Sequence, residues 1–307
     1  MIPNITDKVL PQLFQDADEQ AKQAQNRHFS ILKWYLLLLI LAALLNFFLP
    51  KSQIVAVLSL VIFAATLCLL LWQKKQGYED VWYNARAVAE SVKTQAWRWM
   101  VQASPYQAST EQQQPFAGNA ESFEQAPEHA DKFRHTLLDI VEQNDDKTLN
   151  LSVDEQHDKL LSTTMRQARR LTRQQRLDMY VTQRVKNQRE WYAKRILEFE
   201  RKKSTWFWLS VGLNALAFVL LAYKIFNLEQ SLPIEVISAA ASGAVTWLQA
   251  KKYSELRAAY SQTKAEIDCI LQESEKVVSD SQLAQFVLDS EAAFSREHTQ
   301  WVARKYK

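Results

Sequence analysis

Five polar residues recur at helical spacing inside one of the apolar parts of the chain, residues 234–249. The steps between them are +3, +4, +4 and +3, which places all five on one face of a helix: Glu235, Ser238, Ser242, Thr246 and Gln249. In one interpretation this face lines a water-filled pore in an oligomer, with Glu235 forming an acidic ring at the outer mouth that favours cations. In the other, small residues and hydroxyl groups let neighbouring helices pack closely and hydrogen-bond to one another. The sequence leaves both interpretations open.

A second set of candidate residues is basic. Residues 166–203 include thirteen Lys or Arg residues against four Asp or Glu residues. At the edge of an apolar segment, Arg201, Lys202 and Lys203 can anchor the chain and attract anionic lipids. Further from that segment, a phosphate-bearing ligand could be held by Arg166, Arg169, Arg170, Arg173 and Arg176. The alternatives for these five are a solvated helix face or pairing with the acidic residues of 139–158.

No pattern of residues points to catalysis or to a bound cofactor. The four glycines are too far apart to form a phosphate-binding loop or a dinucleotide-binding turn. None of the five histidines has metalloprotease spacing or lies near a cysteine. One group near position 130 is better explained by the start of a solvated helix than by a metal site: Glu128, His129, Asp131 and His135. We therefore expect no metal, no cofactor and no enzymatic activity, and Cys68 and Cys269 do not support a disulfide framework.

The apolar residues are gathered into four runs rather than spread along the chain. Of the 307 residues, 48% are apolar by type and only four are glycine, which excludes collagenous, disordered and disulfide-rich classes. A bilayer core about 30 Å thick needs about 20 helical residues. The second and third runs meet this length alone, whereas the first and fourth meet it with their flanking residues. The sequence therefore predicts four spans, at about 31–49, 54–72, 205–226 and 234–249.

These spans form two predicted hairpins, with Pro50 and Pro233 in the short connecting loops. All but two of the 37 Lys and Arg residues lie outside those loops. Because basic residues stay on the cytoplasmic side, we expect a multi-pass protein of the bacterial inner membrane with both termini in the cytoplasm. The first span follows a polar segment and has no small-residue cleavage site after it, so we expect it to be an uncleaved anchor.

The remaining polar segments are predicted to be long amphipathic helices that bundle with one another or with neighbouring subunits. One helix is expected to run unbroken from about Arg166 into the third span, because neither Gly nor Pro interrupts it before Gly212. Only residues 104–127 have the composition of a linker. The prediction is thus an all-α membrane protein with a first two-transmembrane unit at 1–103 and a second at 128–307.

Spaced aromatic and charged residues give each half a family resemblance. The first half contains Trp82-x-x-Ala85-Arg86-x-x-Ala89-Glu90-x-x-Lys93-x-x-x-Trp97-x-Trp99-Met100 and then Ala103-Ser104-Pro105-Tyr106. The second half contains Tyr180-x-x-x-Arg184-Val185-x-x-Gln188-x-x-Trp191-Tyr192 and ends with Glu291-x-x-x-x-x-Glu297-x-x-x-Trp301. Both halves resemble the SLATT domains, the SMODS- and SLOG-associating two-transmembrane effectors. The resemblance covers nearly the whole chain except the linker, and it brings no catalytic residues with it.

The resemblance implies a bacterial defence or conflict-system effector that perforates the inner membrane when a nucleotide second messenger or a nucleotide-sensing partner protein signals infection. Together with the polar face at 235–249, it favours an oligomeric gated pore or a membrane-disrupting assembly. The alternative is a membrane-anchored interaction or sensor module in which the spans only anchor. The expected partners are therefore the lipid bilayer and further copies of the chain. No nucleic-acid-binding module is present in the sequence.

Overall fold

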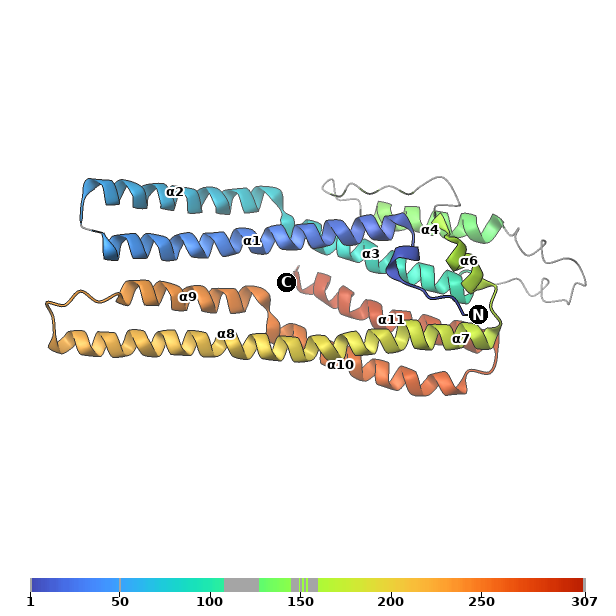
Figure 1. Ribbon diagram of the computed structural model, residues 1–307. Coiled ribbons are helices and arrows are strands. Elements are labelled where there is room, and N and C mark those ends of the chain that lie inside the picture. Colours follow the sequence, from blue (N-terminus) through green and yellow to red (C-terminus); the bar gives the residue numbers. More distant parts are fainter. Residues whose placement is uncertain are drawn as a thin grey trace, which may run out of the picture. The chain divides into compact units, whose positions relative to one another are not determined.

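The computed structural model describes residues 2–49, 51–107, 127–144, 149, 151, 153 and 160–305, and every regular element within them is a helix (Figure 1). Most of the predicted linker, Pro50 and part of the acidic region 139–158 lie outside the described residues. The helices in chain order are η1 (Asp7–Val9), α1 (Gln12–Phe48), α2 (Gln53–Gln76), α3 (Tyr78–Val101), α4 (Pro127–Gln143), α6 (Thr163–Arg169), α7 (Arg173–Tyr180), η4 (Val181–Lys186), α8 (Asn187–Phe226), α9 (Ile234–Lys251), α10 (Tyr253–Glu273), η5 (Ser274–Lys276) and α11 (Asp280–Lys305).

The chain divides into two compact units, and each unit takes segments from both halves of the sequence. The bundle unit consists of Met1–Gln23, Asp80–Ala193 and Tyr260–Lys307. The membrane unit consists of Ala24–Glu79 and Lys194–Ala259. The predicted linker at 104–127 divides the sequence into a first and a second half, which are not the same as these two compact units. The division into two halves at this linker stays a prediction.

The bundle unit is built around a core of aromatic and branched side chains. The amphipathic stripe predicted along α3 is confirmed from Ala85 onward, because Ala85, Val88, Val92, Ala96 and Trp99 are buried, whereas Tyr78 and Val81 at its start are only partly buried. The turn after α3 and other helices add side chains that are almost wholly buried: Tyr106, Phe133, Leu137, Met165, Tyr180, Tyr192, Ile267 and Leu283. The first residues of the chain also belong to this unit, since the Ile5 backbone N–H donates to Oε1 of Gln183 at 2.7 Å.

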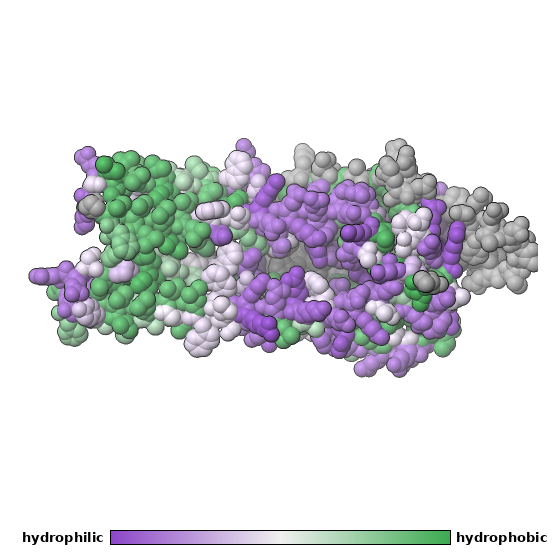
Figure 2. All heavy atoms as spheres, viewed as in Figure 1, coloured by the Kyte–Doolittle hydropathy of each residue, from purple (hydrophilic) through white to green (hydrophobic). Residues whose placement is uncertain are grey.

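The membrane unit has the opposite distribution of apolar residues, with many of them on its surface. On the face shown in Figure 2, hydrophobic residues gather over the hairpins α1–α2 and α8–α9. Phe218 and Phe226 of α8 are 72% and 86% exposed. A soluble protein does not expose an apolar surface of this extent, whereas a lipid-facing one does.

Among the residues that the structure describes, three helical segments have the length and hydropathy to cross a membrane: Gln12–Phe48, Gln53–Val101 and Arg173–Phe226. They contain the first three predicted spans. Helix α9 coincides with the fourth predicted span but is not one of these three. Its 18 residues give a length of about 27 Å at 1.5 Å per residue, close to the thickness of a bilayer core. Its polar residues lower its hydropathy, so this fourth crossing stays a prediction.

Small and hydroxyl-bearing residues hold the membrane unit together. The side chains buried within it include Ala42 of α1, Thr66 of α2, Ser210 of α8, and Ala241 and Ala244 of α9. Such residues let helix backbones approach closely in the absence of a hydrophobic driving force between helices. In addition, Nδ2 of Asn46 in α1 donates to Oγ of Ser59 in α2 at 2.9 Å, which fastens the first hairpin. Asn214, the equivalent polar residue in α8, donates instead to the Ser210 carbonyl of its own helix at 2.8 Å.

The long helix predicted from about Arg166 begins later than the sequence suggested. Helix α6 ends at Arg169, and α7 begins at Arg173 after a break. Thr172 is the N-cap of α7 and forms a capping box with Gln175. The two side chains accept hydrogen bonds from backbone N–H groups that, in a continuous helix, would donate to carbonyl groups of the preceding turn. The expectation of an unbroken rod from Arg166 is therefore wrong at its start. From Arg173 the helical segment continues for 54 residues to Phe226, about 81 Å at 1.5 Å per residue.

A π-helical turn interrupts this long segment at Val181–Lys186. A π-helix contains more residues per turn than an α-helix, so it changes which side chains face the core. In this turn both Arg184 and the adjacent Val185 are buried. The simple helical spacing read from the sequence predicted Val185 as a core residue but not Arg184.

The second helix of each hairpin, α2 or α9, ends in the same backbone conformation. Gly77 follows α2 with φ 56° and ψ 32°, and Lys252 follows α9 with φ 48° and ψ 35°. Each residue is left-handed and precedes a new helix that begins with a tyrosine, Tyr78 or Tyr253. Trp72 and Trp247 lie five residues before these left-handed residues. The two halves of the chain are thus alike in backbone conformation at this point and share a tryptophan and a tyrosine at the same spacing.

Candidate functional site

The polar face predicted on α9 is a continuous exposed surface. All five of its residues are exposed: Glu235, Ser238, Ser242, Thr246 and Gln249. The opposite face of the helix holds the buried residues Ala241 and Ala244. Thr246 donates from Oγ1 to the Ser242 carbonyl at 2.9 Å, so part of its hydrogen-bonding capacity is met within the helix. The single chain therefore turns this polar face outward instead of packing it against its own helices.

The apolar side of α9 is held by contacts within the membrane unit. A Cβ atom added at Gly243 would lie 3.9 Å from Cδ1 of Ile40 in α1, which is ordinary van der Waals contact. At the end of the helix, the Trp247 ring lies 5.9 Å from the Trp206 ring and 6.1 Å from the Phe29 ring, measured between centroids. These contacts fix the rotation of α9 about its axis. They thereby determine which face remains exposed.

Lys251 closes this aromatic cluster. Its Nζ lies 3.2 Å from the centroid of the Phe29 ring and 5.0 Å from that of Trp247, which is cation–π geometry. Burial of the ammonium group and the nearby charge of Lys202 lower the pKa of Lys251 to about 8. The end of α9 that follows Gln249 therefore carries a positive charge that is only weakly favoured at neutral pH.

The predicted lipid-anchoring cations lie on α8. Arg201 and Lys202 are exposed, and Lys203 is partly exposed. Lys202 donates from Nζ to Oε1 of Glu198 at 2.6 Å, and this hydrogen bond contributes most to lowering the pKa of Glu198. Because such exposed pairs are worth at most about 1 kcal/mol, the positive charge remains available to a lipid surface. Their role in lipid attraction stays a prediction.

The structure separates the predicted phosphate-binding arginines into different environments. Arg169 donates from Nη1 to the Trp99 carbonyl at 2.5 Å and from Nη2 to the Tyr106 carbonyl at 2.8 Å. Its guanidinium carbon also lies 4.9 Å from the Trp99 ring centroid. Burial, followed by the charge of Arg176, lowers the pKa of Arg169 to about 10. Arg169 thus satisfies the hydrogen-bonding capacity of carbonyl groups at and beyond the C-terminal end of α3.

Arg176 stabilises the same end of α3. It is 5% exposed, donates to the Val101 carbonyl at 3.2 Å and pairs with Oδ1 of Asp280 at 2.6 Å. The other candidates contact different segments: Arg173 donates to the Val277 carbonyl at 3.1 Å, and Arg166 donates to the Leu161 carbonyl at 3.3 Å. Arg170 is the C-cap residue of α6. A phosphate-binding role for Arg166, Arg169, Arg170 and Arg173 stays a prediction, although the guanidinium groups of Arg166, Arg169 and Arg173 already donate to backbone carbonyl groups.

The group around His129 forms no metal site in the described part of the chain. No cluster of three or more His, Cys, Asp or Glu side chains there has the geometry to hold a metal ion. Burial, followed by the charge of Arg169, lowers the pKa of His129. A partly buried imidazole beside an arginine is compatible with a packing role at the start of α4.

A buried charge network lies in the bundle unit, and sequence analysis did not assign it a role. Glu291 of α11 is 0% exposed and Arg184 of the π-helical turn is 3% exposed. Arg184 donates to Glu291 through Nε at 2.9 Å and through Nη2 at 2.7 Å, so the pair is bidentate. Tyr180 donates to Oε1 of Glu291 at 2.9 Å, and Thr94 of α3 donates to Oε2 at 2.8 Å.

Every oxygen of this buried carboxylate therefore accepts two hydrogen bonds. Burial by itself would lower the pKa of Arg184, but the adjacent Glu291 carboxylate stabilises the cation and raises that pKa above its ordinary value. Burial and the same carboxylate raise the pKa of Tyr180 well above its ordinary value. Tyr180, Arg184 and Glu291 are among the residues that carry the family resemblance. The sequence signal was present in the spacing Tyr180-x-x-x-Arg184 on an otherwise apolar stripe.

The helical architecture and the lipid-facing surface define an all-α membrane protein. Residues 11–121 match the family described as SMODS and SLOG-associating 2TM effector domain 3, and residues 180–301 match domain 1 of the same group. The chain therefore carries two SLATT domains in tandem, as the sequence indicated. SLATT domains are two-transmembrane effector domains associated with conflict and defence systems. No curated protein and no solved structure matches the chain significantly.

Proposed function

We propose that this protein is an effector of a bacterial defence system that assembles in the inner membrane into an oligomeric pore lined by the polar face of α9. The observation that carries the proposal is the exposure of all five polar residues of that face, opposite the buried Ala241 and Ala244. Facing lipid, a carboxylate, an amide and three hydroxyl groups would be disfavoured by several kcal/mol in total. Facing water or a neighbouring subunit, the same groups are satisfied.

In this proposal the acidic Glu235 forms a ring at one mouth of the pore and favours cations. Both termini and the bundle unit lie in the cytoplasm, where the bundle unit receives the signal. The long helical segment Arg173–Phe226 has residues in both units, so a rearrangement of the bundle can be transmitted along it.

The activating signal is a nucleotide second messenger or a nucleotide-sensing partner protein. The arginines of 166–173 are candidate contacts for its phosphate groups.

The test is the conductance of the purified full-length protein in planar bilayers. We expect discrete conductance steps with a cation preference that falls in Glu235→Gln. Ser242→Leu combined with Thr246→Leu should abolish conduction while the protein still inserts. The control is Val236→Leu, which changes an apolar residue on a different face of the same helix and should leave the steps unchanged. Full conductance of the Ser242→Leu/Thr246→Leu variant would contradict the assignment of the pore to this face.

A membrane-anchored interaction module is the second candidate function. It is favoured by the extensive core and buried charge network of the bundle unit, which resemble those of a soluble binding domain. In this case the polar face of α9 binds another helix instead of water. Silent bilayers, together with normal activity of the Ser242→Leu/Thr246→Leu variant in cells, would favour this candidate over the pore.

A further inference from the structure

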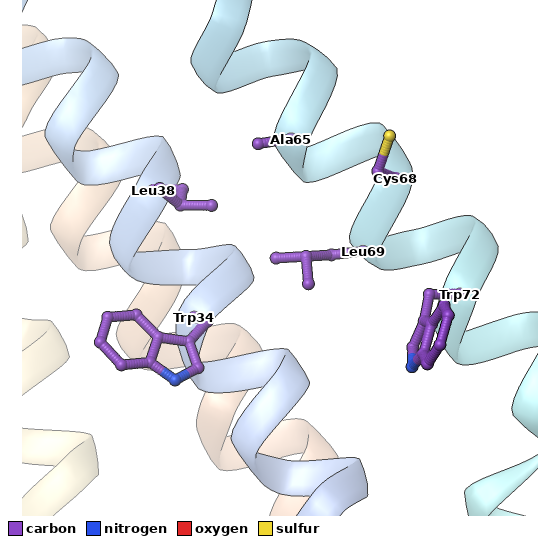
Figure 3. Close-up of a pocket in the computed structure, with 6 residues that line it drawn as sticks. All are labelled: Trp34, Leu38, Ala65, Cys68, Leu69 and Trp72. Atoms are coloured by element: carbon purple, nitrogen blue, oxygen red, sulfur yellow. The ribbon is translucent and has the colours of Figure 1, made fainter.

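An apolar groove of about 450 Å³ lies between α1 and α2 of the membrane unit (Figure 3). Leu38 of α1 and Ala65 and Leu69 of α2 point toward one another across it. The complete lining is apolar or weakly polar and consists of Trp34, Leu38, Ala65, Cys68, Leu69 and Trp72. The small side chains at positions 65 and 68 leave the space open. Trp34 and Trp72 are 57% and 52% exposed beside it.

The groove lies at the level of the lipid acyl chains in the bilayer, below the headgroups. It begins at Trp34 and Trp72, which lie at the ends of the two apolar runs, away from the loop that joins α1 to α2. From Trp72 to Ala65 it follows seven helical residues, about 10 Å. One leaflet of a bilayer core is about 15 Å thick, so the groove lies within its hydrocarbon. Tryptophan at its end is typical of the boundary between hydrocarbon and headgroups.

Positive charge lies beyond the tryptophans on the same helix faces. Lys75 follows Trp72 by three residues and Arg27 precedes Trp34 by seven, so each lies on the face of its neighbouring tryptophan. Both residues are exposed, and the Arg27 guanidinium carbon lies 5.8 Å from the ring centroid of Tyr78. At this end of the hairpin four basic residues, Arg27, Lys33, Lys74 and Lys75, outnumber the two acidic ones, Glu79 and Asp80. The net charge there is therefore complementary to an anionic headgroup.

We infer that the groove binds one acyl chain of an anionic phospholipid, with the phosphate held at the level of Trp34 and Trp72. The indole N–H groups and the Lys75 side chain can donate to the phosphate, because a long basic side chain reaches along the helix to the headgroup layer. Arg27 lies seven residues, about 10 Å, beyond Trp34 and attracts the phosphate through its charge. The chain fills the space over Ala65 and Cys68. This inference depends on the membrane class of the protein and not on the proposed pore.

The experiment is native mass spectrometry of the full-length protein in detergent, titrated with phosphatidylglycerol or with phosphatidylcholine of identical chains. We expect one phosphatidylglycerol to be retained more tightly than phosphatidylcholine. Arg27→Gln and Lys75→Gln should each weaken phosphatidylglycerol binding about fivefold, since a basic residue near an anionic lipid contributes about 1 kcal/mol. Ala65→Leu should reduce retention of both lipids by filling the groove.

Two neighbouring positions provide matched controls. Ala64→Leu makes the same change at an exposed position of α2 that does not line the groove, and Lys74→Gln removes a charge from a different face. Both variants should bind lipid as the unchanged protein does. Equal retention of the two lipids would overturn the anionic preference. An Ala65→Leu variant that binds as well as Ala64→Leu would overturn the groove as the binding site.

Discussion

At the residue scale, the buried carboxylate of Glu291 organises more of the bundle unit than any predicted site residue. It joins α3, the start of the long helical segment and α11 through side chains far apart in sequence. A buried ion pair rarely exceeds a well-packed apolar pair in stability, because both charges lose their hydration. It does penalise any arrangement that leaves one partner unpaired. The network therefore specifies how these three elements come together.

Replacing Glu291 alone should destabilise the protein strongly. Glu291→Gln leaves the Arg184 guanidinium buried without its counter-charge, and breaking such a pair costs about 3–5 kcal/mol. Tyr180→Phe should cost only about 1 kcal/mol, since it removes one hydrogen bond. The measurement is the midpoint of chemical unfolding of the full-length protein in detergent, followed by circular dichroism.

Two control variants distinguish the effect of breaking the buried Arg184–Glu291 pair from the effect of removing a charge in general. Glu273→Gln alters an exposed carboxylate paired with Lys276 and should change stability by less than about 1 kcal/mol. Arg184→Met combined with Glu291→Leu removes both charges and should be less destabilising than Glu291→Gln alone. A single Glu291→Gln variant as stable as the unchanged protein would contradict the structural role of the network.

The sequence predicted the exposed polar face better than the buried polar network. The spacing of Glu235, Ser242 and Thr246 is sufficient to place them on one face, since α9 is a regular helix. Arg184 and Glu291 are charged residues, which are rarely buried unless paired, and their pairing depends on tertiary contacts across 107 residues. The π-helical turn that orients Arg184 has no local sequence signal comparable to Gly or Pro.

At the element scale, helix existence was more predictable than helix boundaries. The apolar runs and amphipathic stripes correctly indicated helices α1, α2, α3, α8, α9 and α10. The break before Arg173 was missed because neither Gly nor Pro marks it: α6 ends at Arg169, and Thr172 begins α7 through capping. The left-handed residue between α9 and α10 was also hidden, because Lys252 occupies a conformation that usually selects Gly.

Replacing glycine by alanine should have opposite effects on stability at Gly77, after the end of α2, and at Gly212, inside α8. Gly77→Ala should destabilise the protein by about 1 kcal/mol, because a left-handed φ of 56° is strained for a residue with a Cβ atom. Gly212→Ala should stabilise it by about 0.5–1 kcal/mol, because Gly212 lies in the interior of α8 and an added Cβ meets nothing within 4 Å. Unfolding midpoints in detergent measure both effects.

Lys252→Gly extends this comparison to the second junction and should raise the midpoint. If Gly77→Ala and Gly212→Ala shifted stability in the same direction, the left-handed conformation at Gly77 would not control the junction.

At the scale of the whole molecule, the two SLATT domains are not separate globular bodies. The match at 11–121 supplies residues to both the bundle unit and the membrane unit, and so does the match at 180–301. Contacts such as Thr94 to Glu291 in the bundle unit and Gly243 to Ile40 in the membrane unit join one domain to the other. Each compact unit is therefore an association of two related halves within a single chain.

This arrangement predicts that a chain divided between the domains reassembles. Fragments 1–121 and 122–307, co-expressed with an affinity tag on only one of them, should purify together in equal amounts. A second fragment that lacks residues 280–307 should associate more weakly, because α11 contributes Leu283, Phe286 and Val287 to the shared core. Fragments that purify independently of each other would contradict the intertwined architecture.

The position of α11 also has a consequence for biosynthesis. Its residues complete a core whose other members, such as Val88 and Trp97, emerge from the ribosome almost 200 residues earlier. Contacts of such long sequence separation form late and slowly. The α1–α2 hairpin can thus enter the bilayer while the bundle is still incomplete. The helices of the bundle unit that are made first, α3 among them, therefore keep part of their apolar surface uncovered until α11 has been synthesised.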